Sequence, residues 1–206
     1  MRYLPISILF LLITSCSLQT TKNLIVIDAS KIEVENPYFS NTNTDYVYKA
    51  KIDIYGKNFG GILIIKKTED NSHRVVFMTE FGNKLFDFLF ENDRVIKNFI
   101  IEELDKKFIV NTLQNDFKLL VSQKNKVASQ YDSGQEDIYK TIDDKQFNFY
   151  FINKKSSILD KIVSTSKTKE KVEVLFSNIE SEIANTILIH HKNIKLNIAL
   201  EIFKKD

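Results

Sequence analysis

Histidine side chains are the groups of this sequence best suited to proton transfer or metal binding. The sequence contains three of them, His73, His190 and His191. His190 and His191 are adjacent in a segment, 187–191, that we expect to be a strand, where neighbouring side chains point to opposite faces. The two rings therefore cannot easily hold one metal ion, and we interpret them as surface and rim histidines. His73 ends the polar stretch 68–73, which we interpret as a hairpin loop, so we expect its ring to be solvated.

The carboxylates suggest no paired acid and base. Asp143 and Asp144 are typical of a turn, and the other acidic residues are spread singly along the expected strands. General acid–base catalysis needs converging groups, and the sequence shows no nucleophile motif, phosphate-binding loop or metal cluster. We therefore expect a protein that is not an enzyme, with no catalytic residues, metal or cofactor. The hydrolase alternative would require a cluster of polar residues deep in a pocket.

The balance of charge gives no sign of a nucleic-acid partner. The 206 residues include 29 basic and 27 acidic side chains, which give a formal net charge of +2. The two signs alternate along the chain instead of clustering. The length is ample for a single domain with a core of its own.

The N-terminus has the features of an export signal. Arg2 precedes the apolar stretch ISILFLLI (6–13), which is shorter than the roughly 20 residues of a membrane-spanning helix and is typical of a signal peptide. The motif that follows, Ile13-Thr14-Ser15-Cys16, resembles the lipobox of bacterial lipoproteins. This resemblance implies that residues 1–15 are a lipoprotein signal peptide and that Cys16 is acylated; the alternative is an ordinary signal peptide with an incidental Cys16. Ser17 in place of Asp after the cysteine favours the outer membrane by the sorting rule of some bacteria.

Cys16 is the single cysteine of the chain. An internal disulfide is therefore impossible, and the fold must depend on its core. We expect residues 16–44, the lead-in, to be a lipidated tether followed by a short ordered element, a helix that starts near Asp28. Residues 45–206 are expected to form one domain.

Hydrophobic periodicity places the elements of that domain. Alternation with a period of two predicts strands, and spacing of three to five residues predicts a helix over 102–123. Gly60-Gly61 suggests a bulge or sharp bend, and residues 122–137 are expected to be a polar connector. The predicted strands are 46–55, 59–67, 74–78, 85–90, 94–100, 146–152, 157–164, 171–177, 187–191 and 194–203.

The fold class expected from this order is mainly β (α+β). The connections are too short for parallel crossovers, so the strands should form one curled antiparallel sheet, an incomplete β-barrel with the helix as its lid. Stripes of phenylalanine would line the concave face. If the helix fills the concavity the stripes are plain core, and if it only covers it they line an apolar cavity for acyl chains. The candidate lining residues are Phe77, Phe86, Phe88, Phe90, Phe147, Phe149 and Phe151.

One turn carries an unexpected aromatic residue. In the sequence MTEFGNKL (78–85), Gly82 suits a turn, but Phe81 beside it does not. Phe81 either packs inward against Phe77 or Leu85, or is held outward to contact something apolar.

The order of these elements resembles that of the LolA/LolB superfamily of periplasmic lipoprotein carriers and receptors. The resemblance covers roughly residues 45–203 and rests on the segment RVVFMTEFGNKLFDF, the helical segment, and the ending KVEVLFSNIESEIANTILIHHKNIKLNIALEIF. It implies a half-barrel with a lidded hydrophobic cavity. In the lipidated receptor the corresponding turn presents an apolar residue to the membrane, which implies a membrane-engaging tip at Phe81 and Gly82. The chain departs from the family at Glu80, where the turn has proline, and at Phe203, where the last strand usually has tryptophan.

Two hypotheses follow for the function. In the first, the protein is anchored to the outer membrane through Cys16 and faces the periplasm. It helps to insert acylated lipoproteins or other lipids, and a soluble periplasmic carrier would be its partner. In the second, it is a non-catalytic structural or interaction lipoprotein with a filled core, a subunit of an envelope complex. An exposed apolar patch without a cavity would favour the second.

Overall fold

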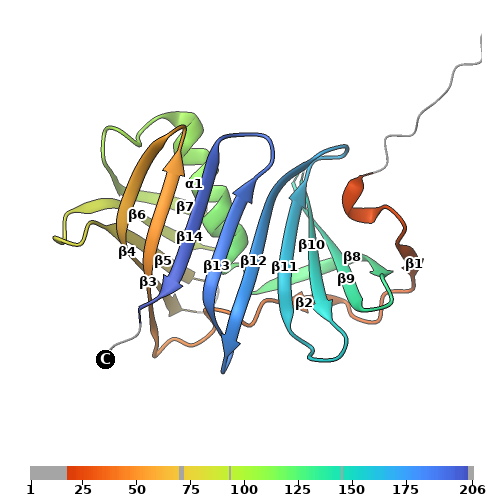
Figure 1. Cartoon of the computed structure of the whole chain (residues 1–206). Helices are drawn as coiled ribbons and strands as arrows, with labels where there is room; N and C mark the ends of the chain where they lie inside the picture. Colours follow the sequence, from red (N-terminus) through yellow and green to blue (C-terminus); the bar gives the residue numbers. More distant parts are fainter. Residues whose placement is uncertain (1–17, 70–71, 93, 145, 204–206) are drawn as a thin grey trace, which may run out of the picture.

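The computed structural model describes residues 18–69, 72–92, 94–144 and 146–203 (Figure 1). Cys16 and the predicted signal peptide lie outside the described residues. The described chain forms strands β1 (Ile25–Ile27), β2 (Glu33–Glu35), β3 (Asp45–Ile54), β4 (Lys57–Glu69), β5 (Ser72–Met78), β6 (Lys84–Glu91), β7 (Arg94–Ile100), β8 (Lys124–Asp132), β9 (Glu136–Asp143), β10 (Gln146–Asn153), β11 (Leu159–Thr165), β12 (Glu170–Glu180), β13 (Ile183–His191) and β14 (Leu196–Ile202), the helix α1 (Lys107–Val121) and the short 3-10 helix η1 (Gln19–Thr21). No helix among these residues is both long and apolar enough to cross a membrane.

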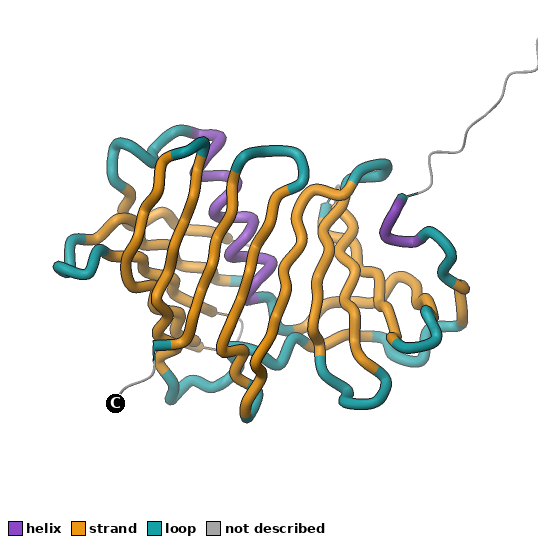
Figure 2. The backbone as a smooth tube through the Cα atoms, viewed as in Figure 1, coloured by secondary structure: helices purple, strands orange, loops and turns teal. Residues whose placement is uncertain are grey.

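The strands form one large antiparallel sheet whose two ends do not meet. Its order is β1-β8-β9-β10-β11-β12-β13-β14-β3-β4-β5-β6-β7, and β2 pairs separately with β8. Figures 1 and 2 show how strongly this sheet curls, so that β5–β7 and β8 lie behind the strands in front. The expectation of an unclosed, mainly β fold is confirmed.

Helix α1 crosses the concave side of the sheet. It connects β7, at one end of the sheet, to β8, near the other end, and therefore has to pass over the face between them (Figure 1). The helix starts at Lys107, five residues later than predicted, because residues 101–105 form a tight turn in which the Asp105 N–H donates to the Ile101 carbonyl. It buries one side against the sheet, including Leu113, Phe117 and Leu120.

Strand register explains how the apolar residues reach one face. In antiparallel strands directly paired residues share a face, so one row of partners can be followed across the sheet. This row consists of Tyr139, Tyr150, Ile162, Val174, Ile189, Ile198, Ile52 and Phe59. The row lies on the concave face and forms the floor of the main hydrophobic core.

The predicted polar connector 122–137 is wrong, because β8 and most of the hairpin to β9 occupy it. Its polar sequence is compatible with strand because β8 is only half buried, with partly exposed residues throughout. The expected bulge at Gly60-Gly61 is also absent from the β3–β4 register. Gly61 instead allows close approach: a Cβ there would lie 2.0 Å from the Met78 backbone oxygen.

The lead-in is more tightly integrated than a tether. In place of the expected helix near Asp28, the chain forms β1 and β2, which pair with β8. Asn36 and Tyr38 are buried, and the Tyr38 hydroxyl donates to the Leu159 carbonyl at 2.5 Å. Residues 33–39 are therefore part of the domain.

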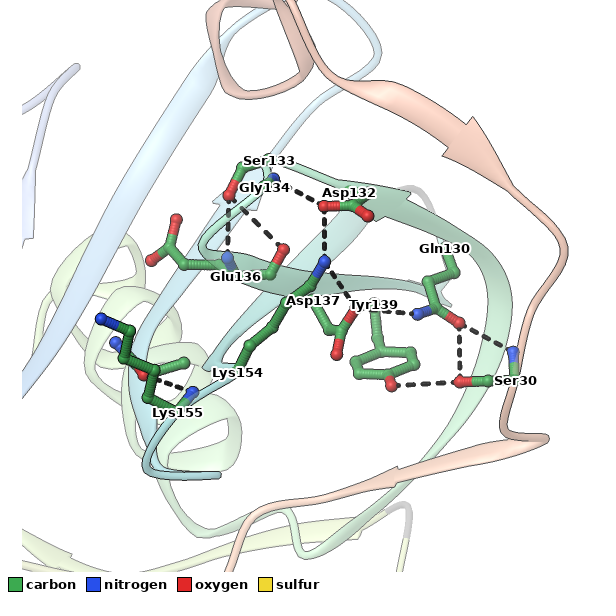
Figure 3. A network of polar contacts seen from close by, with 11 residues as sticks. Ser30, Gln130, Asp132, Ser133, Gly134, Glu136, Asp137, Tyr139, Lys154 and Lys155 are labelled. Atoms are coloured by element: carbon green, nitrogen blue, oxygen red, sulfur yellow. Dashed lines mark hydrogen bonds and ion pairs between the residues drawn. The ribbon is translucent and has the colours of Figure 1, made fainter.

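A polar network fixes the middle of the lead-in to β8 and β9 (Figure 3). The Ser30 N–H and hydroxyl donate to Gln130 Oε1 at 2.7 and 2.9 Å, and Gln130 Nε2 donates to Asp137 at 3.3 Å. Lys154 Nζ lies 2.7 Å from an Asp132 carboxylate oxygen. Because Gln130 is buried, losing these partners would leave an unsatisfied amide.

Candidate functional site

The phenylalanines of β5 and β6 form a packed core under α1. Phe86 stacks on Phe88 with ring centroids 4.8 Å apart and contacts Phe117 of the helix at 5.5 Å. Phe77, Phe86 and Phe88 have no exposed surface, so they border no space large enough for a water molecule. The prediction that these three line a cavity is wrong, because the helix fills the concavity here. Phe90 is buried as well, at the edge of a polar pocket next to His73.

The phenylalanines of β10 face the other side of the sheet. Phe149 and Phe151 form a small separate cluster with Ile138 and Val163, against which Phe147 and Leu24 pack. The prediction that Phe147, Phe149 and Phe151 line the concave face is therefore wrong. Both faces of β10 are covered, the outer one by the lead-in, so the stripe alone could not show which face was concave. The residues that do point inward are Asn148 and Tyr150.

Phe81 lies at the tip of a well-defined turn between β5 and β6. The Gly82 N–H donates to the Thr79 carbonyl and the Thr79 N–H donates to the Asn83 carbonyl, both at 2.9 Å. Gly82 has a φ of +84°, a conformation that glycine adopts without strain. Phe81 is 93% exposed, so the alternative in which it packs inward is wrong and its ring is held outward.

A buried carboxylate supports the strands behind this tip. Asp87 of β6 lies on the outer face and accepts two hydrogen bonds from Arg74, at 3.0 and 2.7 Å, one from Lys84 at 2.8 Å and one from Asn98 at 3.2 Å. The hydrogen bonds from Arg74, followed by those from Lys84 and Asn98, hold the pKa of the Asp87 carboxyl well below its usual range despite its burial. Asp87 thereby joins β5, β6 and β7.

An apolar notch of about 300 Å³ opens where α1 begins. Its apolar walls are Ile54, Tyr55 and Phe59 at the β3–β4 turn and Leu104, Phe108 and Ile109 at the start of the helix, with Lys57, Glu103 and Lys106 around them. Tyr55 and Phe108 are more than half exposed, with ring centroids 6.4 Å apart. None of the phenylalanines predicted to line an acyl cavity borders this notch.

A larger polar cleft of about 610 Å³ follows the other side of α1. The helix, from Phe108 to Ser122, forms one wall, and the ends of β9–β13 form the other. The polar side chains of its lining include Asn115, Asp116, Asn148, Tyr150, Ser164, Lys171, His191 and Asn193. Polar groups therefore line the open part of the concave face.

Asp116 and His191 connect the helix to the sheet at this cleft. His191 Nε2 lies 2.9 Å from Asp116 Oδ2, and both side chains are buried. Burial raises the pKa of the Asp116 carboxyl, and the hydrogen bond from His191 opposes that shift. The pair is a polar clamp between α1 and β13.

Ser164 does not complete a hydrogen-bonded chain with this clamp. Ser164, the serine on the facing wall, lies on β11 with β12 between it and His191, and its hydroxyl donates to Gln146 Oε1 at 3.0 Å. Among the described residues no hydrogen bond joins the Ser164 hydroxyl to His191, whose Nε2 is bonded to Asp116.

Two of the three histidines, His73 and His191, are buried, although we expected all three to lie at the surface, at the rim or in solvent. His190 is exposed and contacts Asn197, while His191 is buried, so the two rings do point to opposite faces. His73 is buried on β5, and its Nε2 lies 3.0 Å from the Phe39 carbonyl; the prediction of a solvated loop residue is wrong because the lead-in covers it. Burial lowers the pKa of His73.

Asp143 and Asp144 do flank the β9–β10 turn. Among the described residues, no group of three or more His, Cys, Asp or Glu side chains could hold a metal ion.

Asn148 and Asp116 were not predicted as site residues from the sequence. Asn148 could have been found, because strict alternation in QFNFYFI (146–152) places it on the face opposite to the phenylalanines. Asp116 gave no signal, because a single acidic residue in an amphipathic helix is usually solvated.

Comparison with known proteins gives a structural likeness only. No family model and no curated protein sequence matches the chain. The fold is similar to that of a LolA superfamily protein from Nitrosomonas europaea, with a TM-score of 0.50 and 8% identity over 83% of this chain and 90% of the other. Weaker similarity links it to an outer membrane lipoprotein-sorting protein domain from Vibrio parahaemolyticus (TM-score 0.43, 9% identity, 78% of this chain and 83% of the other) and a DUF1329 family protein from Desulfovibrio piger (TM-score 0.41, 9% identity, 78% and 84%). The chain therefore has a LolA-like fold.

Proposed function

We propose that this LolA-like protein is a non-catalytic lipoprotein of the cell envelope that binds acyl chains of lipoproteins or other lipids and helps to insert them into the outer membrane. Cys16 carries the acyl anchor, and the domain faces the periplasm, where a soluble carrier could supply the cargo. The observation that supports this best is the apolar notch between α1 and the β3–β4 turn, with Tyr55 and Phe108 exposed at its rim.

The notch suits one acyl chain at most. Its volume of about 300 Å³ is at the lower limit for small-molecule pockets. Each methylene group that it buries contributes about 0.8 kcal/mol, so even part of a chain would be held measurably. The cargo would leave because the membrane buries the whole chain, with no covalent step.

Phe81 is proposed to contact lipid during insertion. Its exposed ring would gain about 1.5–3 kcal/mol on entering an apolar phase. The turn that carries it lies at the left end of Figure 1, whereas η1, the first described element, lies at the right end. Anchor and tip would therefore act at opposite ends of the domain while the lead-in stays docked.

The proposal is tested by native mass spectrometry of residues 17–206 with a triacylated lipopeptide. Truncation at this point removes none of the described core, which extends from Leu24 to Ile202. We expect one lipopeptide per protein. Phe108→Ser should lose most of this binding, whereas Phe99→Ser, an exposed phenylalanine on β7 away from the notch, should not.

The role of the tip is tested separately by transfer of bound lipopeptide to liposomes. Phe81→Glu should slow transfer several-fold and leave binding unchanged. Equal transfer by the wild type and Phe81→Glu would remove Phe81 from the mechanism, and absence of any lipopeptide binding would remove the proposed function itself.

A second candidate function is supported by the filled core. Because Phe86, Phe88 and Phe117 pack together under α1, the concavity offers no large acyl cavity there. A compact domain that binds no lipopeptide would instead favour a structural subunit of an envelope complex.

A further inference from the structure

The inner face of the sheet has a polar row beside its apolar floor. Register places Thr141, Asn148, Ser164, Val172 and His191 next to one another on successive strands. Four of these five side chains are polar, although all five are buried. The neighbouring row, with Tyr150 and Ile162, is the start of the apolar floor. Polarity is therefore concentrated where the sheet faces the cleft.

The Asn148 amide oxygen is a buried polar atom with no hydrogen-bond partner in the described chain. The Tyr150 hydroxyl is buried too, and its polar neighbour is Thr141. Asn148 is only 6% exposed, and its side chain lines the cleft. An unsatisfied buried polar group costs about 1–3 kcal/mol, so such a group in a native protein calls for an explanation.

The remaining lining indicates the chemistry of a ligand. Side-chain amides supply much of it, from Asn115, Asn125, Gln146, Asn148 and Asn193. An amide offers both donors and an acceptor, which complements a hydroxyl group better than it complements a charged group.

The charges of the cleft nearly cancel. Lys118 is paired with Asp143, and Asp116 is paired with His191. Lys171 adds one further positive charge, and Asp144 on the β9–β10 turn adds one negative charge. This balance favours a neutral ligand over an anion such as phosphate, which would need an excess of cationic donors.

We propose that the polar cleft binds a neutral, hydroxyl-rich ligand, a saccharide, through Asn148 and the amides on the facing wall. The volume of about 610 Å³ is within the range of small-molecule sites. The saccharide could be free or could be the head group of a lipid, because Phe108 borders both this cleft and the apolar notch. Binding of a lipid-linked saccharide rests on the proposed lipid-binding function, whereas binding of a free saccharide does not.

Calorimetric titration of residues 17–206 with maltose, cellobiose and N,N′-diacetylchitobiose tests the site. At least one disaccharide should bind with a Kd of about 1 mM or below. Asn148→Leu should weaken it at least tenfold while leaving Tm unchanged or higher, because the variant removes an unsatisfied polar group. Asn197→Leu, an exposed amide on the outer face of β14, is the matched control and should bind normally. Asn115→Ala, on the helix wall, should weaken binding as well and guards against a folding defect at Asn148.

Two detergents below their critical micelle concentrations distinguish the sources. Dodecyl maltoside should bind at least tenfold more tightly than maltose if the ligand is a glycolipid, with Phe108→Ser removing this gain; equal affinities indicate a free saccharide. Dodecylphosphocholine has the same dodecyl chain but no sugar. If it binds and no saccharide does, the proposed acyl-chain function stands and the saccharide site is refuted. Three results would each overturn the inference. The first is that neither the three disaccharides nor dodecyl maltoside bind; the second is that inorganic phosphate binds instead. The third is saccharide binding that Asn148→Leu does not change.

Discussion

Replacing Asp87 by asparagine should destabilise the half of the sheet that carries the Phe81 turn. The buried carboxylate accepts four hydrogen bonds, from Arg74, Lys84 and Asn98. Asn keeps the shape but loses the charge, and it places an amide NH₂ against donors. Removing one partner of a buried ion pair costs about 3–5 kcal/mol. Because Arg74 and Lys84 are nearly half exposed and can be solvated in the variant, we expect the lower end, about 3 kcal/mol.

Urea unfolding at pH 7 measures this loss. For a domain of this size, about 3 kcal/mol corresponds to a fall in Tm of roughly 6–12 °C. The matched control is Asp45→Asn, since Asp45 pairs with Lys66 at 2.8 Å but both side chains are about half exposed. An exposed pair contributes at most about 1 kcal/mol. Similar losses for the two variants would refute the role of burial at Asp87.

Acidification provides an independent check. The pKa of Asp87 is lower in the folded protein than its unfolded value of about 3.9, so its stabilisation is complete above the unfolded pKa. It is lost as the pH falls through the folded pKa. The difference in stability between wild type and Asp87→Asn should therefore be constant from pH 7 to about pH 5 and become smaller below about pH 4. A difference that stays constant down to the lowest measurable pH would contradict the assignment.

Three further predictions concern packing, the clamp and the lead-in. Gly61→Ala should lower Tm strongly, because its Cβ would lie 2.0 Å from a backbone oxygen of β5, whereas Gly60→Ala, which points into open space, should be nearly neutral. Asp116→Ala should cost about 3–5 kcal/mol by leaving a buried histidine unpaired, and Asp116→Leu combined with His191→Leu should recover most of that loss in thermal unfolding. Gln130→Ala should release the lead-in and speed tryptic cleavage before residue 33 several-fold; unchanged cleavage would show that β1 and β2 hold it without the network.

The sequence predicted the strands of the sheet well because alternation reflects burial directly. Ten predicted strands coincide with β3–β7 and β10–β14, and α1 lies within the predicted helical segment. β8 and β9 were missed. β8 is partly exposed along its length, which leaves little periodic signal, and β9 begins inside the predicted connector 122–137. It was harder to predict which face of each strand lies on the concave side of the sheet. On β10 both Phe149 and Tyr150 are fully buried, so alternation shows two faces without showing which is concave.

The candidate site was the least predictable part, because its position depends on where α1 packs. The helix covers Phe77, Phe86 and Phe88 and leaves β9–β12 open, so the predicted apolar cavity is filled there and the space beside β9–β12 is polar. Nothing in the local sequence of Asn148 or Asp116 shows that helix and sheet bring them to one cleft. Such pairings between distant segments follow from tertiary packing.

The lead-in determines how the two ends of the molecule could reach a membrane. Leu18, the first described residue, is two positions after Cys16, and two residues span at most about 7 Å. With η1 and β1 docked on β8 and β12, an acylated Cys16 would hold the right end of the domain in Figure 1 at its membrane, whereas the β5–β6 turn lies at the left end. Contact of both with one bilayer therefore requires residues 18–32 to detach. Detachment would take Leu24 off the Phe149–Phe151 cluster and Ser30 off the buried Gln130 amide, whereas the main core, which begins at Val34, would stay closed. It would extend the tether by roughly 15 residues, or about 50 Å.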